Sequence, residues 1–303
     1  ARCRALADAC RKRGWNVWWM TASREGKKFA TASGKKVKVL PITRYSSDRE
    51  HAQKIRKPLS PGDVVVLDGY HFGRGLEREL RGSGVKVVTI DDNARRFFMS
   101  NWVINGNVHA RDLCYRHARG TKLALGSKFF IFSDEVRRAR RDRRIIRKEV
   151  RKILVTMGGA DPSNQLLKVL KGIEWARLPR VSVLVIAGTA NRRFTQVKRF
   201  AAKRSFGCRV LRATPRIGGE MAKADLGIGS AGRIATEMAF LGLPGLRIVL
   251  ADNQRGLIRK IHREGAAINL GWHRRLTPGR IAVHLRRLIG NVALRKKMSH
   301  KGR

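Results

Sequence analysis

A glycine-rich stretch in the C-terminal half of the chain has the residue types of an anion-binding turn. Residues 227–232 read Gly-Ile-Gly-Ser-Ala-Gly, and they separate an apolar run from a stretch with helical periodicity at 234–241. Small side chains let a ligand approach the backbone, and the first N–H groups of a helix are unpaired and partly positive. A diphosphate fits such a turn. A turn that only packs a helix on a strand is the alternative.

Polar residues follow at spacings that extend this candidate site. Glu237 lies about one turn into the expected helix, where its carboxylate can accept hydrogen bonds from the paired hydroxyls of a ribose. The next apolar run, 246–250, leads into Asp252, Asn253 and Gln254. We therefore count this triplet with the candidate site.

A second glycine turn follows the apolar run 153–156. Gly158 and Gly159 can adopt positive φ, Asp161 is a good N-cap, and Pro162 suits the first helical position. The pattern predicts a second helix N-terminus on the same side of the sheet, although it matches neither a Walker loop nor a GxGxxG fingerprint. An ordinary strand-to-helix turn is the alternative, but two such turns together favour a binding site.

Polar residues also follow an expected strand at 64–67 in the N-terminal half. Asp68 and Tyr70 are expected to point into a cleft, where the phenol can donate to a sugar or pyrophosphate oxygen. His71 is an acid–base candidate because its ordinary pKa lies near neutrality. A surface histidine in a loop is the favoured interpretation of His71.

Two adjacent carboxylates, Asp91 and Asp92, follow the expected strand 85–90. Such a pair suggests metal or acid–base chemistry, but neighbours on an extended chain point to opposite sides. Capping of the next turn by at least one of them is the favoured interpretation. We expect no bound metal and no cofactor.

Short apolar runs alternate with amphipathic stretches, which predicts an α/β fold of parallel sheets covered on both faces. Strands are expected at 17–21, 37–41, 64–67, 85–90, 102–104, 153–156, 181–187, 226–229 and 246–250. Helices are expected at 1–13, 75–81, 163–173, 192–203, 234–241 and 254–264. With a boundary between Ser133 and Arg151, we divide the chain into doubly wound domains 1–145 and 146–303 with a ligand cleft between them.

The charge of the chain is unusual, because 67 Lys and Arg oppose 22 Asp and Glu for a formal net charge of +45. Such a field attracts nucleic acid, anionic lipid or a phosphorylated substrate. Only 137–151 forms a dense basic cluster, for which a solvated helix between the domains is favoured over nucleic-acid contact. No apolar run approaches the ~20 residues that span a bilayer, and the cysteines lack metal-site spacing. We expect a cytoplasmic protein, and the sequence indicates no oligomeric state.

Taken together and in order, the motifs resemble the UDP-sugar hydrolases of pseudaminic acid biosynthesis, which are relatives of the GT-B glycosyltransferases. The residues that carry the resemblance are 66–70, 90–92, 158–162, 229–244 and 251–254, so it covers nearly the whole chain. It implies a GT-B-like fold whose C-terminal domain binds UDP. It also implies hydrolysis at the anomeric carbon of UDP-2,4-diacetamido-2,4,6-trideoxy-β-L-altropyranose, in which a base-activated water displaces UDP and releases the free sugar.

The resemblance assigns roles to individual residues. By it, Glu237 holds the ribose, Asn253 lies beside the sugar, and Tyr70 faces the substrate, with Tyr70 and Asn253 as the catalytic candidates. The other residues expected around UDP are Gly158, Gly159, Gly229, Ser230, Gly232, Arg233 and Gln254. Those expected on the sugar side are Asp68 and Asp252.

The chain also departs from the family it resembles. In the family, the catalytic histidine lies in a Gly-x-Gly-His loop that precedes a helix. Arg2 and Cys3 match that helix, so the resemblance places the histidine before Ala1. We therefore expect that the sequence is a fragment cut at its N-terminus. Arg233 and Ile234 replace the usual Ser-Thr, and the charge of Arg233 can substitute for the lost hydroxyls. A GT-B glycosyltransferase with a UDP-sugar donor, and a non-enzymatic sugar-nucleotide or polyanion-binding protein, stay open as alternatives.

Overall fold

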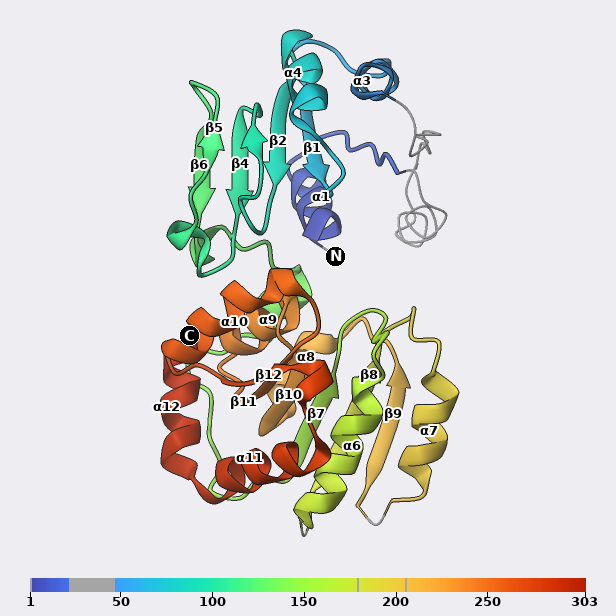
Figure 1. Cartoon of the computed structure of the whole chain (residues 1–303), viewed down its shortest axis with the longest axis vertical. Coiled ribbons are helices and arrows are strands. Elements are labelled where there is room, and N and C mark those ends of the chain that lie inside the picture. Colours follow the sequence, from blue (N-terminus) through green and yellow to red (C-terminus); the bar gives the residue numbers. More distant parts are fainter. Residues whose placement is uncertain (1, 22–46, 179, 205) are drawn as a thin grey trace. The chain divides into compact units, whose positions relative to one another are not determined.

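The computed structural model of the chain describes residues 2–21, 47–178, 180–204 and 206–303 (Figure 1). The strand expected at 37–41 lies outside the described residues. The chain divides into two compact units, 1–133 and 134–303, which are referred to below as unit 1 and unit 2. This division falls before residue 145, where the sequence-based division was drawn.

Unit 1 is built on a four-stranded parallel sheet with strand order β1-β2-β4-β6. The strands are β1 (Val64–Asp68), β2 (Lys86–Ile90), β4 (Trp102–Asn105) and β6 (Lys122–Leu125), beside a two-stranded pair of β3 (Phe97–Phe98) and β5 (Arg116–His117). The helices are α1 (Arg2–Lys12), α3 (Asp48–Arg56) and α4 (Arg74–Gly82), with short 3₁₀ turns η1 (Ala110–Asp112) and η2 (Ser127–Phe129). The strands expected at 64–67, 85–90 and 102–104 are confirmed, whereas 17–21 forms no strand.

One face of the unit 1 sheet is buried and the other is partly open among the described residues. Leu76 and Leu80 of α4 belong to the same buried cluster as Leu67 of β1. On the other face, Val66 is 37% exposed and Trp102 is 41% exposed. Among the described residues, this face of the sheet is therefore less fully covered than the other.

Unit 2 contains a six-stranded sheet with strand order β12-β11-β10-β7-β8-β9, and all neighbouring strands are parallel. The strands are β7 (Lys152–Thr156), β8 (Ser182–Ala187), β9 (Cys208–Arg212), β10 (Leu226–Ser230), β11 (Gly245–Val249) and β12 (Ile268–Trp272). The helices are α5 (Asp134–Ala139), α6 (Gln165–Ala176), α7 (Phe194–Ala202), α8 (Ile217–Lys223), α9 (Arg233–Phe240), α10 (Arg255–Arg263), α11 (Pro278–Gly290) and α12 (Val292–Gly302), with 3₁₀ turns η3 (Asp252–Gln254) and η4 (His273–Arg275).

The core of unit 2 follows from its near-continuous runs of Val, Ile and Leu. Every residue of β10 and of β11 is buried, which requires helices on both faces of the sheet. Helix α6 packs on α11, α9 packs on β10, and α7 packs on β9. The four strands expected in this half and the four helices are confirmed to within a few residues at their ends.

The basic segment 137–151 is not the solvated helix that its composition suggests, because α5 ends at Ala139. Several of its arginines donate to acceptors within unit 2. Arg144 donates to the carbonyl oxygens of Leu241 and Met221, each at 3.1 Å, and Arg147 donates to Asp225 at 2.8 Å. The segment therefore belongs structurally to unit 2.

Two further arginines of unit 2 are fully buried and hold carbonyl oxygens. Arg247 in β11 donates to Gly227 at 2.7 Å and to Leu243 at 3.2 Å, and burial lowers its pKa to about 9. Arg295 in α12 donates to four carbonyl oxygens, those of Leu288, Ile289, Arg147 and Lys148. Some of the arginines that make the chain basic therefore stabilise the fold of unit 2.

Candidate functional site

The chain reverses its direction of travel across the unit 2 sheet between β7 and β10 (Figure 1). From β7 it moves outward through β8 and β9, and then returns to β10 on the other side of β7 before reaching β11 and β12. The loops that leave β7 and β10 therefore diverge at the carboxyl edge of the sheet. In open parallel sheets this is the place where ligands bind.

The two glycine turns meet at this point of the sheet. Gly158, just after β7, has a φ of 85°, which favours glycine. A Cβ built on Gly158 would lie 3.9 Å from the hydroxyl oxygen of Ser230, the last residue of β10. The sequence placed both residues in one site, and the structure brings them side by side.

The carboxyl end of β11 contributes Gln254. Its side-chain oxygen accepts from the Leu250 N–H at 2.9 Å, and a Cβ on Gly232 would lie 3.2 Å from its side-chain nitrogen. Gly232 is the N-cap residue of α9, and among the described residues no side chain caps that helix. The start of α9 and Gln254 therefore border the same small region.

Arg233 and Glu237 form an ion pair on the first turns of α9. The distance between Arg233 Nε and Glu237 Oε1 is 2.7 Å, and the Glu237 side chain is 8% exposed. Burial raises the pKa of Glu237, while the Arg233 guanidinium opposes that shift. The Glu237 carboxylate can accept hydrogen bonds from a diol when the Arg233 guanidinium leaves one carboxylate oxygen to the diol or turns away from Glu237.

Gly188, which follows β8, was not singled out from the sequence. A Cβ on this residue would collide with the carbonyl oxygens of Gly158 and Gly159. Only glycine lets the end of β8 approach the first glycine turn this closely. A glycine directly after the buried strand 182–187 was the available signal.

Two residues of the glycine motifs have structural duties. Gly229 lies inside β10, where a Cβ would be 2.8 Å from the Ile234 side chain, so its small size lets α9 pack on the strand. Asp161 accepts from the N–H groups of Gln165 and Leu166 at 2.8 and 3.0 Å.

The predicted start of α6 is therefore wrong in detail. Helix α6 begins at Gln165 with Asn164 as its N-cap, and Pro162 lies outside the helix. The carboxylate of Asp161 occupies N–H groups at the start of this helix. That helix start is thus less available to a diphosphate than the start of α9.

The polar triplet after β11 is split between exposed and partly buried positions. Asp252 forms an ion pair with Arg255 at 2.7 Å, and the Arg255 guanidinium lies 4.4 Å from the centre of the Trp272 ring. Asn253 is partly buried within the 3₁₀ turn η3.

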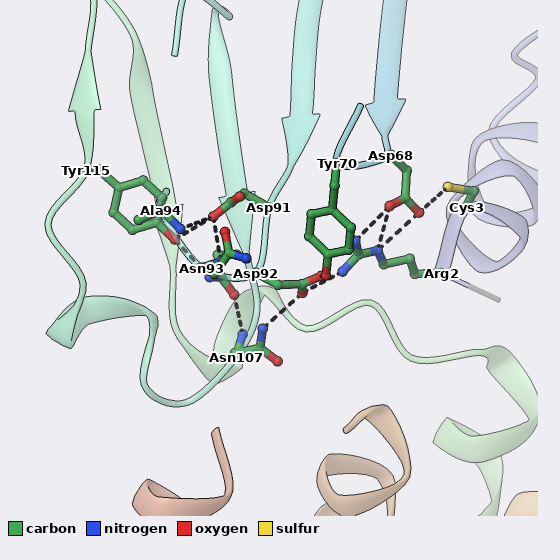
Figure 2. Close-up of polar contacts among 11 residues, drawn as sticks. Arg2, Cys3, Asp68, Tyr70, Asp91, Asp92, Asn93, Ala94, Asn107 and Tyr115 are labelled. Atoms are coloured by element: carbon green, nitrogen blue, oxygen red, sulfur yellow. Dashed lines mark hydrogen bonds and ion pairs between the residues drawn. The ribbon is translucent and has the colours of Figure 1, made fainter. Parts of the chain in front are cut away.

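In unit 1, an arginine joins the ends of two strands (Figure 2). Arg2 of α1 contacts Asp68, the last residue of β1, through Nη2 at 2.7 Å and Nε at 3.1 Å. Its Nη1 contacts Asp92, which follows β2, at 2.7 Å. The Cys3 thiol also donates to Asp68, and burial with this carboxylate raises the pKa of Cys3 to about 12, which keeps the thiol protonated.

Tyr70 belongs to the same cluster (Figure 2). The residue is 64% exposed, and its hydroxyl donates to Asp92 Oδ2 at 2.8 Å. The other oxygen of Asp92 accepts from Asn107 Nδ2 at 3.0 Å as well as from Arg2. In this structure the Tyr70 phenol donates to Asp92, and its donation to a ligand stays a prediction.

Asp91 has different partners from its neighbour. It accepts from the N–H groups of Asn93 and Ala94 at 2.9 and 2.7 Å, which confirms the expected capping of the next turn. His71 is exposed and packs on Phe72, in agreement with a surface histidine. Among the described residues, no group of three or more His, Cys, Asp or Glu is placed to hold a metal ion.

Comparison with solved structures defines the fold as GT-B. The chain is similar to MurG of Acinetobacter baumannii, with a TM-score of 0.68 and 17% identity over 100% of this chain and 90% of that chain. It is also similar to CalG4, the calicheamicin glycosyltransferase, with a TM-score of 0.62 and 13% identity over 98% of this chain and 88% of that chain. It is similar as well to a UDP-N-acetylglucosamine 2-epimerase, with a TM-score of 0.60 and 13% identity over 99% of this chain and 88% of that chain.

Among curated proteins, the chain is similar to the spore coat polysaccharide biosynthesis protein SpsG of Bacillus subtilis strain 168. The two are 25% identical over 246 residues, which are 79% of this chain and 71% of that protein. No protein-family model matches the chain. No helix among the described residues has both the length and the apolar character that crossing a membrane requires.

Proposed function

We propose that the chain is a UDP-sugar hydrolase that binds UDP through the carboxyl edge of the unit 2 sheet and releases a free 2,4-diacetamido sugar. The observation that carries the proposal is the meeting of Gly158, Ser230 and the start of α9 at the point where the strand order reverses. The fold shared with enzymes named for UDP-sugars supports it. The similarity to a polysaccharide biosynthesis protein agrees with a sugar-nucleotide substrate.

In this proposal each group at the edge has a physical task. Glu237 accepts hydrogen bonds from the ribose hydroxyls, and the N–H groups at the start of α9 face the diphosphate. Arg233 forms an ion pair with Glu237 at 2.7 Å, and it is close enough to the helix start to share its charge with the leaving group. Asn253, in the turn that follows β11, is assigned to the sugar.

The proposal is tested by calorimetric titration of UDP into the wild type and the Glu237→Ala variant. Loss of charge-assisted hydrogen bonds to the ribose should weaken UDP binding by roughly 10- to 100-fold. The matched control is Glu174→Ala in α6, because Glu174 also pairs with an arginine of unit 2, Arg204, at 2.5 Å. Equal UDP affinity in the wild type and Glu237→Ala would remove the site assignment.

A GT-B glycosyltransferase is the second candidate, and the similarity to MurG and CalG4 favours it. The two activities differ in their need for an acceptor. Release of free sugar from the UDP-sugar in water alone supports the hydrolase, whereas turnover only after a sugar or lipid-linked acceptor is added supports the transferase.

A binding protein without enzymatic activity is the remaining candidate, and the net charge of +45 favours it. Heparin affinity measured with and without UDP distinguishes it. Tight, salt-sensitive heparin binding by a chain that ignores UDP would replace the enzymatic proposal.

A further inference from the structure

We infer that residues 140–148 and helix α12 together form a surface that docks unit 2 on an anionic phospholipid bilayer, with the side chain of Ile145 inserted among the lipids. The two stretches are called the α12 surface below. This docking goes beyond the proposed function and does not depend on it.

Hydrogen bonds hold the segment 140–148 along helix α12. In the first half of the helix, Arg295 Nη2 donates to the carbonyl oxygen of Lys148 at 2.7 Å. At the end of the helix, Arg303 Nη2 donates to the carbonyl oxygen of Arg141 at 2.8 Å. The segment therefore runs antiparallel beside α12, at the labelled C-terminal end of the chain (Figure 1). Both bonds end on backbone oxygens of the segment, so they do not engage its side chains.

The α12 surface lies at the amino edge of the unit 2 sheet. Arg147 donates to Asp225 at 2.8 Å, and Asp225 directly precedes β10. The candidate nucleotide site lies at the carboxyl edge of the same sheet. Docking through the α12 surface therefore uses residues other than those assigned to UDP.

The α12 surface carries positive charge with little acidic charge to oppose it. Exposed basic side chains come from both stretches, among them Arg141, Arg143, Lys148, Lys296, Lys297 and Lys301. Asp142 is the only acidic residue in the sequence of either stretch. Clusters of roughly four to eight Lys and Arg residues are typical of surfaces that bind anionic lipid headgroups.

Ile145 adds an apolar group to this basic surface. It is 79% exposed, more than any other large apolar residue that the structure describes. Its neighbour Arg144 is directed inward, where it donates to the carbonyl oxygens of Leu241 and Met221, each at 3.1 Å. A single exposed apolar residue is common on proteins. Here it stands among basic side chains, and a bilayer is the anionic partner that can bury it.

The same residue types favour a bilayer over nucleic acid. Neither stretch contains Phe, Tyr or Trp, the side chains on which the bases of a single strand stack. Contacts to phosphate alone use positive charge and gain nothing from Ile145. We therefore make nucleic-acid binding an outcome of the test.

The first measurement is flotation of the full chain with phospholipid vesicles at about 0.1 M sodium chloride. The wild type should bind vesicles that contain phosphatidylglycerol and should not bind vesicles of phosphatidylcholine alone. Ile145→Ser changes no charge and should lower the partition coefficient roughly tenfold. Val283→Ser in α11 is the matched control, because Val283 is 56% exposed and lies outside the α12 surface. Equal binding by Ile145→Ser and the wild type would overturn the inference.

The second measurement separates this surface from the general charge of the chain, since a net charge of +45 attracts anionic vesicles on its own. Two variants each lose three exposed positive charges. The α12 variant combines Arg143→Gln, Lys297→Gln and Lys301→Gln. The α7 variant, its matched control, combines Lys198→Gln, Arg199→Gln and Lys203→Gln, which lie in α7 or directly after it.

The α12 variant should bind anionic vesicles roughly 100-fold more weakly than the wild type, because each basic side chain near the membrane contributes to binding. The α7 variant should lose less than about fivefold, since salt screens charges that lie farther than a Debye length from the lipid. Equal losses in the two variants would show that overall charge drives binding and would overturn the inference.

A polyuridylate oligonucleotide tests the competing partner with the same two variants. If the wild type binds the oligonucleotide but not the anionic vesicles, and the α12 variant loses that binding, the surface belongs to nucleic acid and the inference falls. UDP titration has no bearing on these outcomes, so the proposed function and the docking surface can fail separately.

Discussion

Glu237 shows how a single buried carboxylate can couple stability to pH. Burial raises its pKa above the ordinary value of 4.5. Below pH 4.5 the folded and unfolded chains both hold this proton, and above the raised pKa neither does. In between only the folded chain holds it, so the contribution of Glu237 to the free energy of unfolding falls as pH rises through that interval.

Urea unfolding of the wild type and Glu237→Gln from about pH 3 to about pH 8 checks this prediction. The wild type should lose stability relative to the variant as pH rises. Glu220→Gln should give the opposite trend, because the hydrogen bond from Lys152 lowers the pKa of Glu220 and its stabilisation is lost as pH falls. If the difference in free energy of unfolding between the wild type and Glu237→Gln does not change with pH, the raised pKa of Glu237 is contradicted.

Individual residue positions could be predicted from the sequence where strand ends fixed them, but side-chain pairing could not. Gly158 and Ser230 were placed together because both lie at the carboxyl ends of buried parallel strands. The bond between Arg2 and Asp68 joins residues 66 positions apart, and no local pattern encodes it. Asp92 was noted in the sequence, but its hydrogen bond with Tyr70, 22 positions away, could not be predicted from a local pattern.

We expect Arg144 to stabilise unit 2 through hydrogen bonds to the C-terminal ends of α8 and α9. It donates to Leu241, the C-cap of α9, and also to Met221 and to Ala224, the C-cap of α8. Carbonyl oxygens at helix C-termini lack partners within the helix and carry partial negative charge. Arg144→Met leaves these carbonyls without that donor and should cost about 2–4 kcal/mol.

Urea unfolding of Arg144→Met and Arg143→Met measures this cost. Arg143 is exposed and removes the same charge from the neighbouring position, so its loss should change stability by less than about 0.5 kcal/mol. Similar stabilities for the two variants would show that Arg144 contributes only its charge.

At the scale of elements, prediction succeeded where burial dictated the residue types. Strands such as β7 and β8 are runs of Val, Ile and Leu that only a doubly covered sheet explains. Strand β9 reads Cys-Arg-Val-Leu-Arg and is only partly buried, so its pattern was too weak to detect. The prediction of a helix over 137–151 was wrong because arginine favours helices intrinsically. In the structure, hydrogen bonds from Arg144 and Arg147 to distant parts of unit 2 hold most of this segment outside a helix.

For the whole molecule, the net charge of +45 predicts a stability that depends on ionic strength. Like charges repel one another in the compact state, and salt screens that repulsion. The thermal unfolding midpoint should therefore rise between about 0.05 M and about 0.5 M sodium chloride. An uncharged osmolyte at matched osmotic strength is the control. A midpoint that falls or stays constant with salt would mean that local ion pairs, such as Arg147 with Asp225, outweigh the repulsion.

The strand order of unit 2 also has a consequence for how the protein is made. Ile153 of β7 pairs with Leu226 of β10, and the chain must pass through β8 and β9 before the two can meet. Contacts between residues so far apart in the sequence form slowly. During synthesis on the ribosome, the side of β7 that pairs with β10 would stay without a hydrogen-bonded neighbour until β10 emerges. The carboxyl edge that we assign to the nucleotide is thus completed only after β8, β9 and β10 have all been synthesised.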